Sequence, residues 1–354
     1  MPPGWDEHAD VVVVGFGGAG ASAAIEAARA GADVLVLDRF AGGGATAMSG
    51  GVVYAGGGTS TQVAAGVPDS SEAMFDYLSA EVGDVVTPAT LRRFCAESAG
   101  MISWLTDVGV PFDARLCPYK TSYPTNEFYL YYSGSENAWP FRSLASPAPR
   151  GHRARGRGTS GKVFFAALAA AARAAGARIR PRTVARELVV EDGRVVGVEC
   201  TSLSGGRLRH RLMHRYATKP GLYVPGLARI LHRRIERLER RYGKTMRIRA
   251  RRGVVLAAGG FVNNRQLMRE HAPEFRGGLP LGTQGDDGSG IALGVAAGGR
   301  TDRMSTISAW RFLTPPSALL RGILVDRSGA RFIDESSYGA AIGAALVTER
   351  AGRA

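Results

Sequence analysis

The chain has 354 residues, 45% of them hydrophobic and 48 of them glycine, which is enough for two globular domains with many tight turns. Its three cysteines, Cys95, Cys117 and Cys200, are too few and too scattered for a disulfide framework or a zinc site. The N-terminal stretch MPPGWDEHAD has no basic or apolar region typical of a signal peptide, and no uncharged apolar run reaches the ~20 residues of a membrane-spanning helix. We therefore expect a cytoplasmic protein.

Residues 10–40, DVVVVGFGGAGASAAIEAARAGADVLVLDRF, predict a strand, a glycine-rich turn, a helix ended by Gly31, and a second strand. Gly15, Gly17 and Gly20 form a G-x-G-x-x-G pattern at that turn. The first glycine makes the tight turn, the second lets a pyrophosphate approach the backbone, and the third lets the helix pack on the sheet. The helix N-terminus supplies amide donors for phosphate oxygens.

Asp38 ends the second strand, 18 residues after Gly20, about where an acidic residue binds the ribose hydroxyls of a dinucleotide. The alternative is a glycine-rich turn in an ordinary α/β protein, but strand, helix and terminal acid all occur here in the expected order. An acid at this place disfavours a 2′-phosphate, so NADP fits least. NAD and FAD both stay open from this unit alone.

The rest of the chain predicts mixed α and β structure. Residues 182–200, RTVARELVVEDGRVVGVEC, predict a β-hairpin around a type I′ turn at Asp192-Gly193. No internal repeat is visible. The other expected elements, in chain order, are a glycine-rich coil at 41–60, helices within 72–109 with Trp104 and Leu105 in the core, a loop-rich segment at 111–160, a helix at 161–177 and a buried strand at 252–261.

The basic character belongs to one segment. Residues 206–252 contain 16 Lys and Arg but two acidic residues, which accounts for the whole net charge of +14. Apolar residues recur at helical spacing over 226–242 and predict an amphipathic helix. Three interpretations stay open for it: a solvated face, a helix on a membrane surface, or a nucleic-acid contact. The last fits poorly, because no aromatic residues interleave with the arginines and no known module accompanies them.

Two features favour FAD over NAD. In an NAD dehydrogenase the second strand leads directly into another helix and strand, whereas here it leads into glycine-rich coil at 41–60. An extended Gly/Ser/Thr run suits the flavin end, which continues past the pyrophosphate and needs close backbone. A second strand ending in Gly-Gly, at 259–260, suits a nucleotide domain assembled from distant segments.

Four motifs resemble, in order, those of the fumarate reductase and 3-ketosteroid dehydrogenase flavoprotein superfamily. They are GGGATAMSGG at 42–51, VVLAAGGF at 254–261, GTQGDDGSGIALGVAAGG at 282–299, and GILVDRSGARFIDESSYG at 322–339. The resemblance implies an α/β fold with a Rossmann-like FAD-binding domain of the GR2 type and an inserted α+β capping domain. It places the FAD-binding domain at 1–304, with the basic insertion at about 206–250, and the start of the cap at 305–354. Because the family continues past the cap with a segment that closes over the flavin, we expect the chain to be incomplete.

The resemblance also implies the cofactor contacts. Ser49, Gly50 and Gly51 would lie near the flavin N5 edge, and Val184 would hold the adenine through its backbone, unless it is a plain strand residue. FAD would be bound non-covalently, because no histidine follows the glycine-rich stretch closely. No metal site is expected. The remaining implied contacts are Gly15, Gly17, Gly18, Ala19, Gly20, Asp38, Arg39, Gly44, Ala45, Thr46, Ala258, Gly259, Asp286 and Asp287.

The sequence differs from the fumarate reductases at the residue that is expected to transfer the proton. There an Arg follows the hairpin glutamate by three or four residues, whereas here Glu335 is followed by Ser-Ser-Tyr. Tyr338 stands in the place that ketosteroid dehydrogenases of the superfamily fill with Tyr. A phenol can accept the proton next to a ketone if donors stabilise its anion. The alternative is a packing residue with a hydrogen-bonded hydroxyl.

The loop-rich segment carries an aromatic cluster made of Tyr119, Tyr123, Phe128, Tyr129, Tyr131, Tyr132 and Trp139. It predicts either the wall of a flat apolar pocket or interior packing under a long loop. Its PRGH sequence contains Arg150 and His152, which we expect on a solvated loop rather than at the pocket mouth.

The resemblance, together with Tyr338, implies an FAD-dependent oxidoreductase acting on CH–CH groups, with the 3-ketosteroid dehydrogenases as the most similar members. It would desaturate the ring next to the ketone, at either the Δ4(5α) or the Δ1 position, with hydride passing to flavin N5 and a proton to Tyr338. Two alternatives remain: a fumarate reductase-like ene-reductase, which predicts an Arg at the place of Tyr338, and an inactive flavin-binding fragment. The substrate would be a small apolar ketone. The electron acceptor is unknown, no nucleic acid is expected, and the 226–242 helix makes peripheral membrane contact possible.

Overall fold

The computed structural model describes residues 4–351, and their contacts divide into two compact units. One unit joins the chain up to Met48 with Phe165–Thr306, and the other joins Ser49–Phe164 with the chain from Ile307. The predicted division at 304 and 305 into a cofactor domain and a cap stays a prediction.

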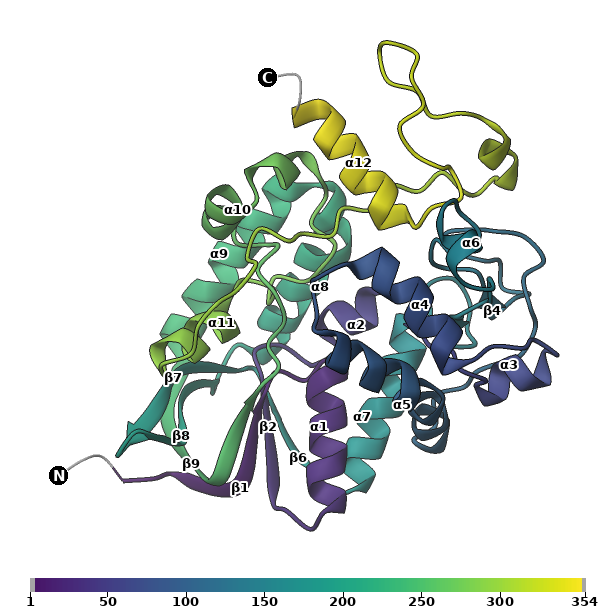
Figure 1. Ribbon diagram of the computed structural model, residues 1–354. Coiled ribbons are helices and arrows are strands. Elements are labelled where there is room, and N and C mark those ends of the chain that lie inside the picture. Colours follow the sequence, from purple (N-terminus) through teal and green to yellow (C-terminus); the bar gives the residue numbers. More distant parts are fainter. Residues whose placement is uncertain (1–3, 352–354) are drawn as a thin grey trace. The chain divides into compact units, whose positions relative to one another are not determined.

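The first unit is built on a six-stranded sheet with the strand order β6-β2-β1-β9-β8-β7 (Figure 1). Strand β1 pairs in parallel with β2 and β9, and β2 pairs in parallel with β6, whereas β7, β8 and β9 are antiparallel neighbours. Val12, Val13 and Val36 are fully buried, as expected for parallel strands covered on both faces. The bounds are β1 Glu7–Val14, β2 Val34–Asp38, β6 Arg178–Pro181, β7 Thr183–Glu191, β8 Arg194–Leu203 and β9 Gly243–Leu256.

Helix α1, Gly18–Arg29, follows β1 and packs against the sheet, so the predicted strand–turn–helix–strand unit is confirmed. Its buried residues Gly20, Ala21, Ala24 and Ile25 lie on one face at helical spacing, and most of them are small, which allows close packing. Gly31 has a positive φ of 80° just after the helix, which is the conformation that ends helices. The unit also contains α2 Gly44–Met48, α10 Arg265–His271, η1 Pro273–Gly277 and α11 Ser289–Ala296. Helix α7, Gly161–Ala174, begins in the second unit and belongs to this one from Phe165.

The predicted hairpin is formed by β7 and β8. Asp192 and Gly193 at its turn both have positive φ, 50° and 71°, as a type I′ turn requires.

Between β8 and β9 the chain makes a pair of packed helices, α8 Arg207–Tyr223 and α9 Pro225–Tyr242. The predicted 226–242 helix is therefore confirmed as α9. Its apolar residues Ile235 and Leu238 are buried, whereas Leu227 and Ile230 are exposed. The C-terminal half of its apolar stripe thus packs inside the unit, and the N-terminal half is exposed in part.

The second unit combines a small antiparallel sheet, β3-β5-β4, with helices. Leu105 is buried on the long α5 as predicted, and Trp104 is half-buried. The bounds are β3 Val52–Tyr54, α3 Ser60–Ala64, α4 Ser71–Val82, α5 Pro88–Asp107, β4 Leu130–Tyr131, α6 Phe141–Leu144, β5 Gly151–Arg153, η2 Ser317–Arg321 and α12 Gly339–Ala351.

Within residues 4–351, no helix has both the length and the apolar character that a membrane crossing requires. The same residues contain no cluster of three His, Cys, Asp or Glu side chains that could hold a metal ion. The three cysteines are free thiols and buried.

Candidate cofactor site

The glycine-rich turn connects β1 to α1, and two of its glycines are required by packing. Gly15 has a φ of 101°, and a Cβ there would lie 2.3 Å from the carbonyl oxygen of Ala257. A Cβ at Gly20 would lie 1.9 Å from the carbonyl oxygen of Gly15. The turn therefore fits against β9 and α1 only with glycine at both positions.

Gly17 differs from these two glycines. A Cβ there would meet nothing closer than 3.6 Å, so the protein itself does not require glycine at this position. Gly17 is the N-cap of α1 and has no side chain to bond the first amides of the helix. The free backbone N–H groups at a helix N-terminus can bind phosphate oxygens, so the turn is suited to a pyrophosphate.

A cavity of about 270 Å³ opens beside this turn, at the carboxyl ends of β1, β2 and β9. Ligands of open α/β sheets bind at this edge. Thr46 reaches across from α2, and its hydroxyl accepts the Gly18 N–H at 2.9 Å. The predicted cofactor residues that line the cavity are Gly15, Gly17, Gly18, Ala19, Asp38, Arg39, Gly44, Ala45, Thr46, Val184, Ala258, Gly259 and Asp286.

Asp38 lines the cavity, but its carboxylate already serves the backbone. Its oxygens accept the N–H groups of Phe16, Phe40 and Gly42 at 2.9, 2.7 and 3.1 Å. Burial raises the pKa of Asp38, and these three donors oppose that rise. Asp38 therefore shapes the loop that follows β2, and its predicted contact with ribose hydroxyls stays a prediction.

Some predicted contacts lie elsewhere. Gly20 packs α1 against the turn instead of lining the cavity. Asp287 is not among the lining residues, and it accepts a hydrogen bond from Arg39 Nη1 at 2.8 Å. Ser49, Gly50 and Gly51 belong to the second unit, and their predicted place near the flavin stays a prediction.

The sequence analysis did not identify several lining residues. The GTQGDDGSG motif holds three of them and could have indicated them, while Phe40 directly follows the predicted Arg39. Leu293 lies on α11, and the others come from β1, β2 and β7 or from the residues just after β1 and β9, where the sequence gives no sign of a ligand. The residues not identified are Val14, Phe16, Leu37, Phe40, Thr183, Ala185, Ala257, Thr283, Gly285, Ser289 and Leu293.

The second unit holds the Ser49–Gly51 turn tightly. The Tyr123 hydroxyl donates to the Gly50 carbonyl at 2.7 Å, and a Cβ at Gly50 would lie 2.6 Å from the Tyr123 ring. Gly51 has a φ of 66°, and a Cβ there would lie 2.6 Å from the Ser160 carbonyl carbon. Both glycines are therefore required by the fold of this unit.

Tyr338 directly precedes α12, also in the second unit. Its N–H donates to the Ser135 hydroxyl at 2.9 Å, and its ring packs edge-on against Trp310 with centroids 4.6 Å apart. Burial, with a smaller effect from the negative charge of Glu81, raises the pKa of Tyr338 to about 12. Its hydroxyl therefore keeps its proton at neutral pH. Glu335 is buried and accepts hydrogen bonds from the Leu324 N–H and the Arg331 guanidinium.

The expectation of a solvated loop at 150–152 was wrong. Arg150 and His152 are both fully buried. The Arg150 guanidinium binds both carboxylate oxygens of Asp69, at 2.7 and 3.0 Å. His152 Nε2 lies 2.8 Å from the Thr59 hydroxyl, and burial lowers the pKa of His152 to about 4. His152 lies on β5, and the polar groups of Arg150 and His152 find partners on the 56–69 segment, so both residues belong to the interior.

The aromatic cluster divides in two. Tyr129 and Tyr131 are buried, whereas Trp139 and Tyr119 are 67% and 39% exposed. The first pair belongs to interior packing. The pocket wall predicted for the cluster as a whole stays a prediction.

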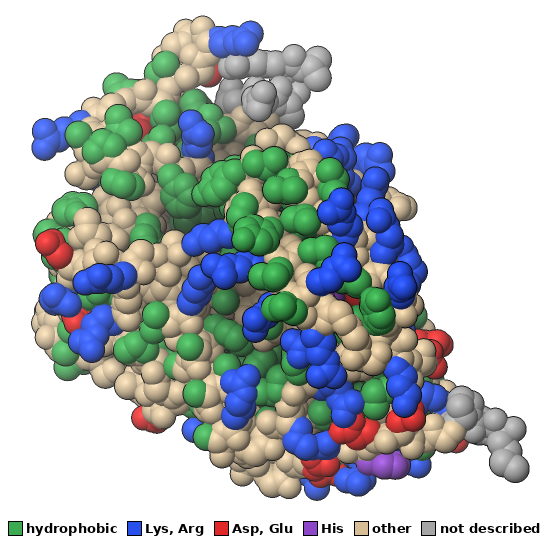
Figure 2. All heavy atoms as spheres, turned by 180° about the vertical axis from the view of Figure 1, so that it is seen from behind, with side chains coloured by type: hydrophobic (Ala, Val, Ile, Leu, Met, Phe, Trp, Pro, Cys, Tyr) green, Lys and Arg blue, Asp and Glu red, His purple; other side chains and the backbone are tan. Residues whose placement is uncertain are grey.

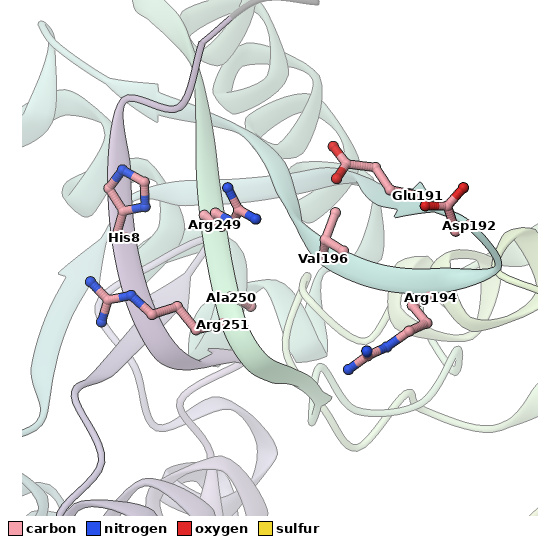
Figure 3. A pocket seen from close by; sticks show the side chains of 8 residues that line it. All are labelled: His8, Glu191, Asp192, Arg194, Val196, Arg249, Ala250 and Arg251. Carbon is pink, nitrogen blue, oxygen red and sulfur yellow. The ribbon is translucent and has the colours of Figure 1, made fainter.

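A second hollow lies on the first unit, over strands β1, β8 and β9 (Figure 3). It is shallow, and its side chains carry both signs of charge, with Arg249 and Arg251 opposite Glu191 and Asp192. It shares no residue with the cavity at the glycine-rich turn. We assign no ligand to it.

The chain matches the FAD binding domain family over residues 10–353 and belongs to that family. Its cofactor is therefore FAD, in agreement with the glycine-rich cavity. The fold is the α/β fold of this family, as predicted.

The chain is similar in sequence to named enzymes, and in structure to one of them. The 3-oxo-5-alpha-steroid 4-dehydrogenase of Comamonas testosteroni is 40% identical over 99% of this chain and 67% of its own length. The structure of 3-ketosteroid-delta4-(5alpha)-dehydrogenase from Rhodococcus jostii RHA1, in complex with 4-androstene-3,17-dione, is 36% identical and superposes with a TM-score of 0.82 over 98% of this chain and 65% of its own. A cytochrome-type fumarate reductase of Shewanella frigidimarina is 26% identical over 92% of this chain and 48% of its own length. The chain thus spans about half to two thirds of the length of these relatives.

Proposed function

We propose that the protein is an FAD-dependent oxidoreductase that desaturates a 3-ketosteroid next to its ketone. The observation that carries this proposal is the likeness of nearly the whole chain to the R. jostii dehydrogenase, at 36% identity. The bound steroid of that enzyme supports a steroid as substrate here, and the name of the C. testosteroni relative favours the Δ4(5α) position. The residues 1–304 would form the FAD-binding domain, and 305–354 would begin the cap.

The cavity beside the glycine-rich turn would hold the adenosine diphosphate part of FAD. The backbone at Gly17 and the N-terminus of α1 would contact the pyrophosphate, and the start of β7 at Val184 would contact the adenine. When bound, FAD accepts a hydride from a carbon β to a ketone.

The protein residues would supply the proton transfer. Desaturation breaks a C–H bond α to the ketone, and its proton must reach a base while the hydride leaves from the neighbouring carbon. We assign the base to Tyr338. Because the pKa of Tyr338 is raised to about 12, its hydroxyl would pass its own proton to solvent water as the α proton arrives at the phenol oxygen. A neutral hydroxyl at this place also suits an apolar substrate better than a guanidinium does.

The test is an anaerobic titration of the flavin-loaded protein. Addition of 5α-androstane-3,17-dione should bleach the blue absorption band of oxidised flavin, whereas 4-androstene-3,17-dione should bleach it only if the protein acts at the Δ1 position. A Tyr338→Phe variant should retain flavin and bleach at least about a hundredfold more slowly, within the range that general bases contribute. Bleaching by neither steroid, with reoxidation of reduced flavin by fumarate, would favour the ene-reductase. No reaction with any of these ligands would favour an inactive flavin-binding fragment.

We also propose peripheral contact of the protein with an anionic membrane, through α8 and not through the predicted 226–242 helix, α9, whose Ile235 and Leu238 are buried. The supporting surface is the outer face of α8, defined by Leu208, Leu212 and Tyr216, which are 61%, 41% and 55% exposed and four residues apart. Exposed Arg209, Arg211 and Arg215 flank this face. On the face of the molecule seen in Figure 2, apolar side chains lie among many Lys and Arg. An apolar stripe bordered by cations suits anionic lipid headgroups.

Co-sedimentation with lipid vesicles tests this contact. The protein should bind vesicles that contain phosphatidylserine, bind pure phosphatidylcholine weakly, and be released by salt. A Leu212→Glu, Tyr216→Glu double variant should lose binding, and Leu319→Glu, at a 53% exposed residue outside α8, should retain it. Equal binding by the double variant, or no binding of phosphatidylserine by the wild type, would reject the proposal.

A further inference from the structure

The helix pair α8–α9 is not needed to complete the sheet. Leu203 at the end of β8 pairs directly with Gly243 at the start of β9, so the chain leaves the sheet and returns to the same place. A short turn could join these two antiparallel strands. The reason for the insertion must therefore lie in what α8 and α9 contact.

The main contact is a buried ion network around Arg39, which lines the cofactor cavity. Its guanidinium binds both carboxylate oxygens of Glu239 on α9, with Nε–Oε1 and Nη2–Oε2 distances of 3.1 and 3.0 Å. Its Nη1 binds Asp287 at 2.8 Å. Glu239 also accepts a hydrogen bond from His210 Nε2 on α8, at 3.2 Å. A bidentate Arg–carboxylate pair fixes both position and orientation.

Burial shows that this network is internal. The side chains of Glu239 and His210 are 5% and 1% exposed, and that of Arg39 is 16% exposed. Burial works against ionisation of Glu239, but hydrogen bonds from His210 and Arg39 lower its pKa to about 2. The carboxylate therefore stays ionised and paired at any pH at which the protein would be studied.

A second contact involves Phe40, the next residue of the cavity wall. The His214 ring of α8 stacks on the Phe40 ring with centroids 3.6 Å apart and planes 10° apart. Burial, and then the charge of Arg39 and neighbouring histidines, lowers the pKa of His214 to about 3, so its ring is neutral. The loop before α11 also lies against Phe40, since a Cβ at Gly285 of that loop would lie 3.4 Å from the Phe40 ring.

These contacts join two loops that line the cavity. The loop after β2 contributes Arg39 and Phe40, and the loop before α11 contributes Gly285 and Asp286. Asp38 holds the backbone of the first loop, whereas the side chains of Arg39 and Phe40 take their positions from contacts with α9 and α8. Glu239 holds Arg39 toward Asp287, and His214 holds Phe40. Loops fixed in the bound arrangement lose less freedom when the ligand arrives.

We propose that α8–α9 is a clamp that retains FAD by holding these two loops in their binding arrangement. Glu239, His210 and His214 are positioning residues, because they act through Arg39 and Phe40. The proposal rests on FAD binding alone and is independent of the steroid substrate.

The test measures the rate at which FAD leaves the protein. FAD fluorescence rises on release, so a stopped-flow trace after dilution gives the dissociation rate. Glu239→Gln keeps the shape of the side chain but removes its charge, and it should speed release at least about tenfold. The matched control is Glu236→Gln on the same helix, whose partner is His232 and which should stay within about twofold of wild type. Release from Glu239→Gln at the wild-type rate would overturn the proposal.

Hydrogen exchange of the unaltered protein gives an independent test if the variant does not fold. FAD should slow amide exchange in α8 and in the second half of α9, as well as at the glycine-rich turn. Protection at the turn without protection in α8 and α9 would reject the clamp. A protein that binds FAD and shows both kinds of protection but converts no steroid would reject the proposed substrate and leave the clamp intact.

Discussion

The replacement of Gly20 by alanine is a sharp test of the cofactor site. A Cβ at this position would lie 1.9 Å from the carbonyl oxygen of Gly15, and real contacts of this kind do not fall below 3.0 Å. The helix and the turn must therefore separate by about 1 Å or more. Overpacking of this size costs about 1–3 kcal/mol. The separation moves the N-terminus of α1 away from the turn, so the pyrophosphate loses amide contacts as well.

We expect Gly20→Ala to weaken FAD binding at least tenfold, which corresponds to about 1.4 kcal/mol. Titration of the apoprotein with FAD, followed by flavin fluorescence, measures this directly. The control is Gly253→Ala on β9, where a Cβ would meet nothing within 4 Å and should leave the affinity within about twofold. Gly20→Ala with wild-type affinity would show that the turn does not bind FAD as described.

Two further predictions concern the second unit. Arg150→Met should lower the free energy of unfolding by about 3–5 kcal/mol, because it leaves the Asp69 carboxylate buried without its partner. The control Arg93→Met, at an exposed ion pair, should cost less than about 1 kcal/mol. Equal midpoints of urea unfolding for the two variants would contradict this. The pKa of His152, lowered to about 4 by burial, predicts stability that is full above pH ~6.5 and falls by about 3 kcal/mol as the pH drops to ~4, since the unfolded chain binds a proton there that the folded protein does not. His152→Gln should reduce this pH dependence, and an unchanged slope would refute the assignment.

Local patterns were enough to predict the cofactor side of the protein. Gly15 and Gly20 are required by close backbone contacts, and the G-x-G-x-x-G pattern makes both visible in the sequence. Gly17 has no such steric limit and leaves the backbone open to a ligand. The β7–β8 hairpin was predicted for the same reason, since positive φ at Asp192 and Gly193 is a local requirement. These local patterns account for the part of the cavity lining at the turn, the end of β2 and β7, while Gly44–Thr46, Ala258, Gly259 and Asp286 were implied by the family resemblance.

Other features depend on partners far apart in the chain. Arg150 and His152 were expected in solvent because charged residues usually are, and their burial depends on Asp69 and Thr59 more than 80 residues away. Helix α8 was not predicted, because Pro220 and a high density of Arg hide its periodicity. The contact between Glu239 and Arg39 spans 200 residues and leaves no local signal.

The central claim is that the protein removes two hydrogens from a saturated 3-ketosteroid. The most direct measurement is mass spectrometry of 5α-androstane-3,17-dione after anaerobic incubation with one equivalent of the flavin-loaded protein. We expect conversion to 4-androstene-3,17-dione, lighter by two hydrogens, in step with loss of oxidised flavin. Unchanged steroid in the presence of fully bound, reducible flavin would contradict the claim.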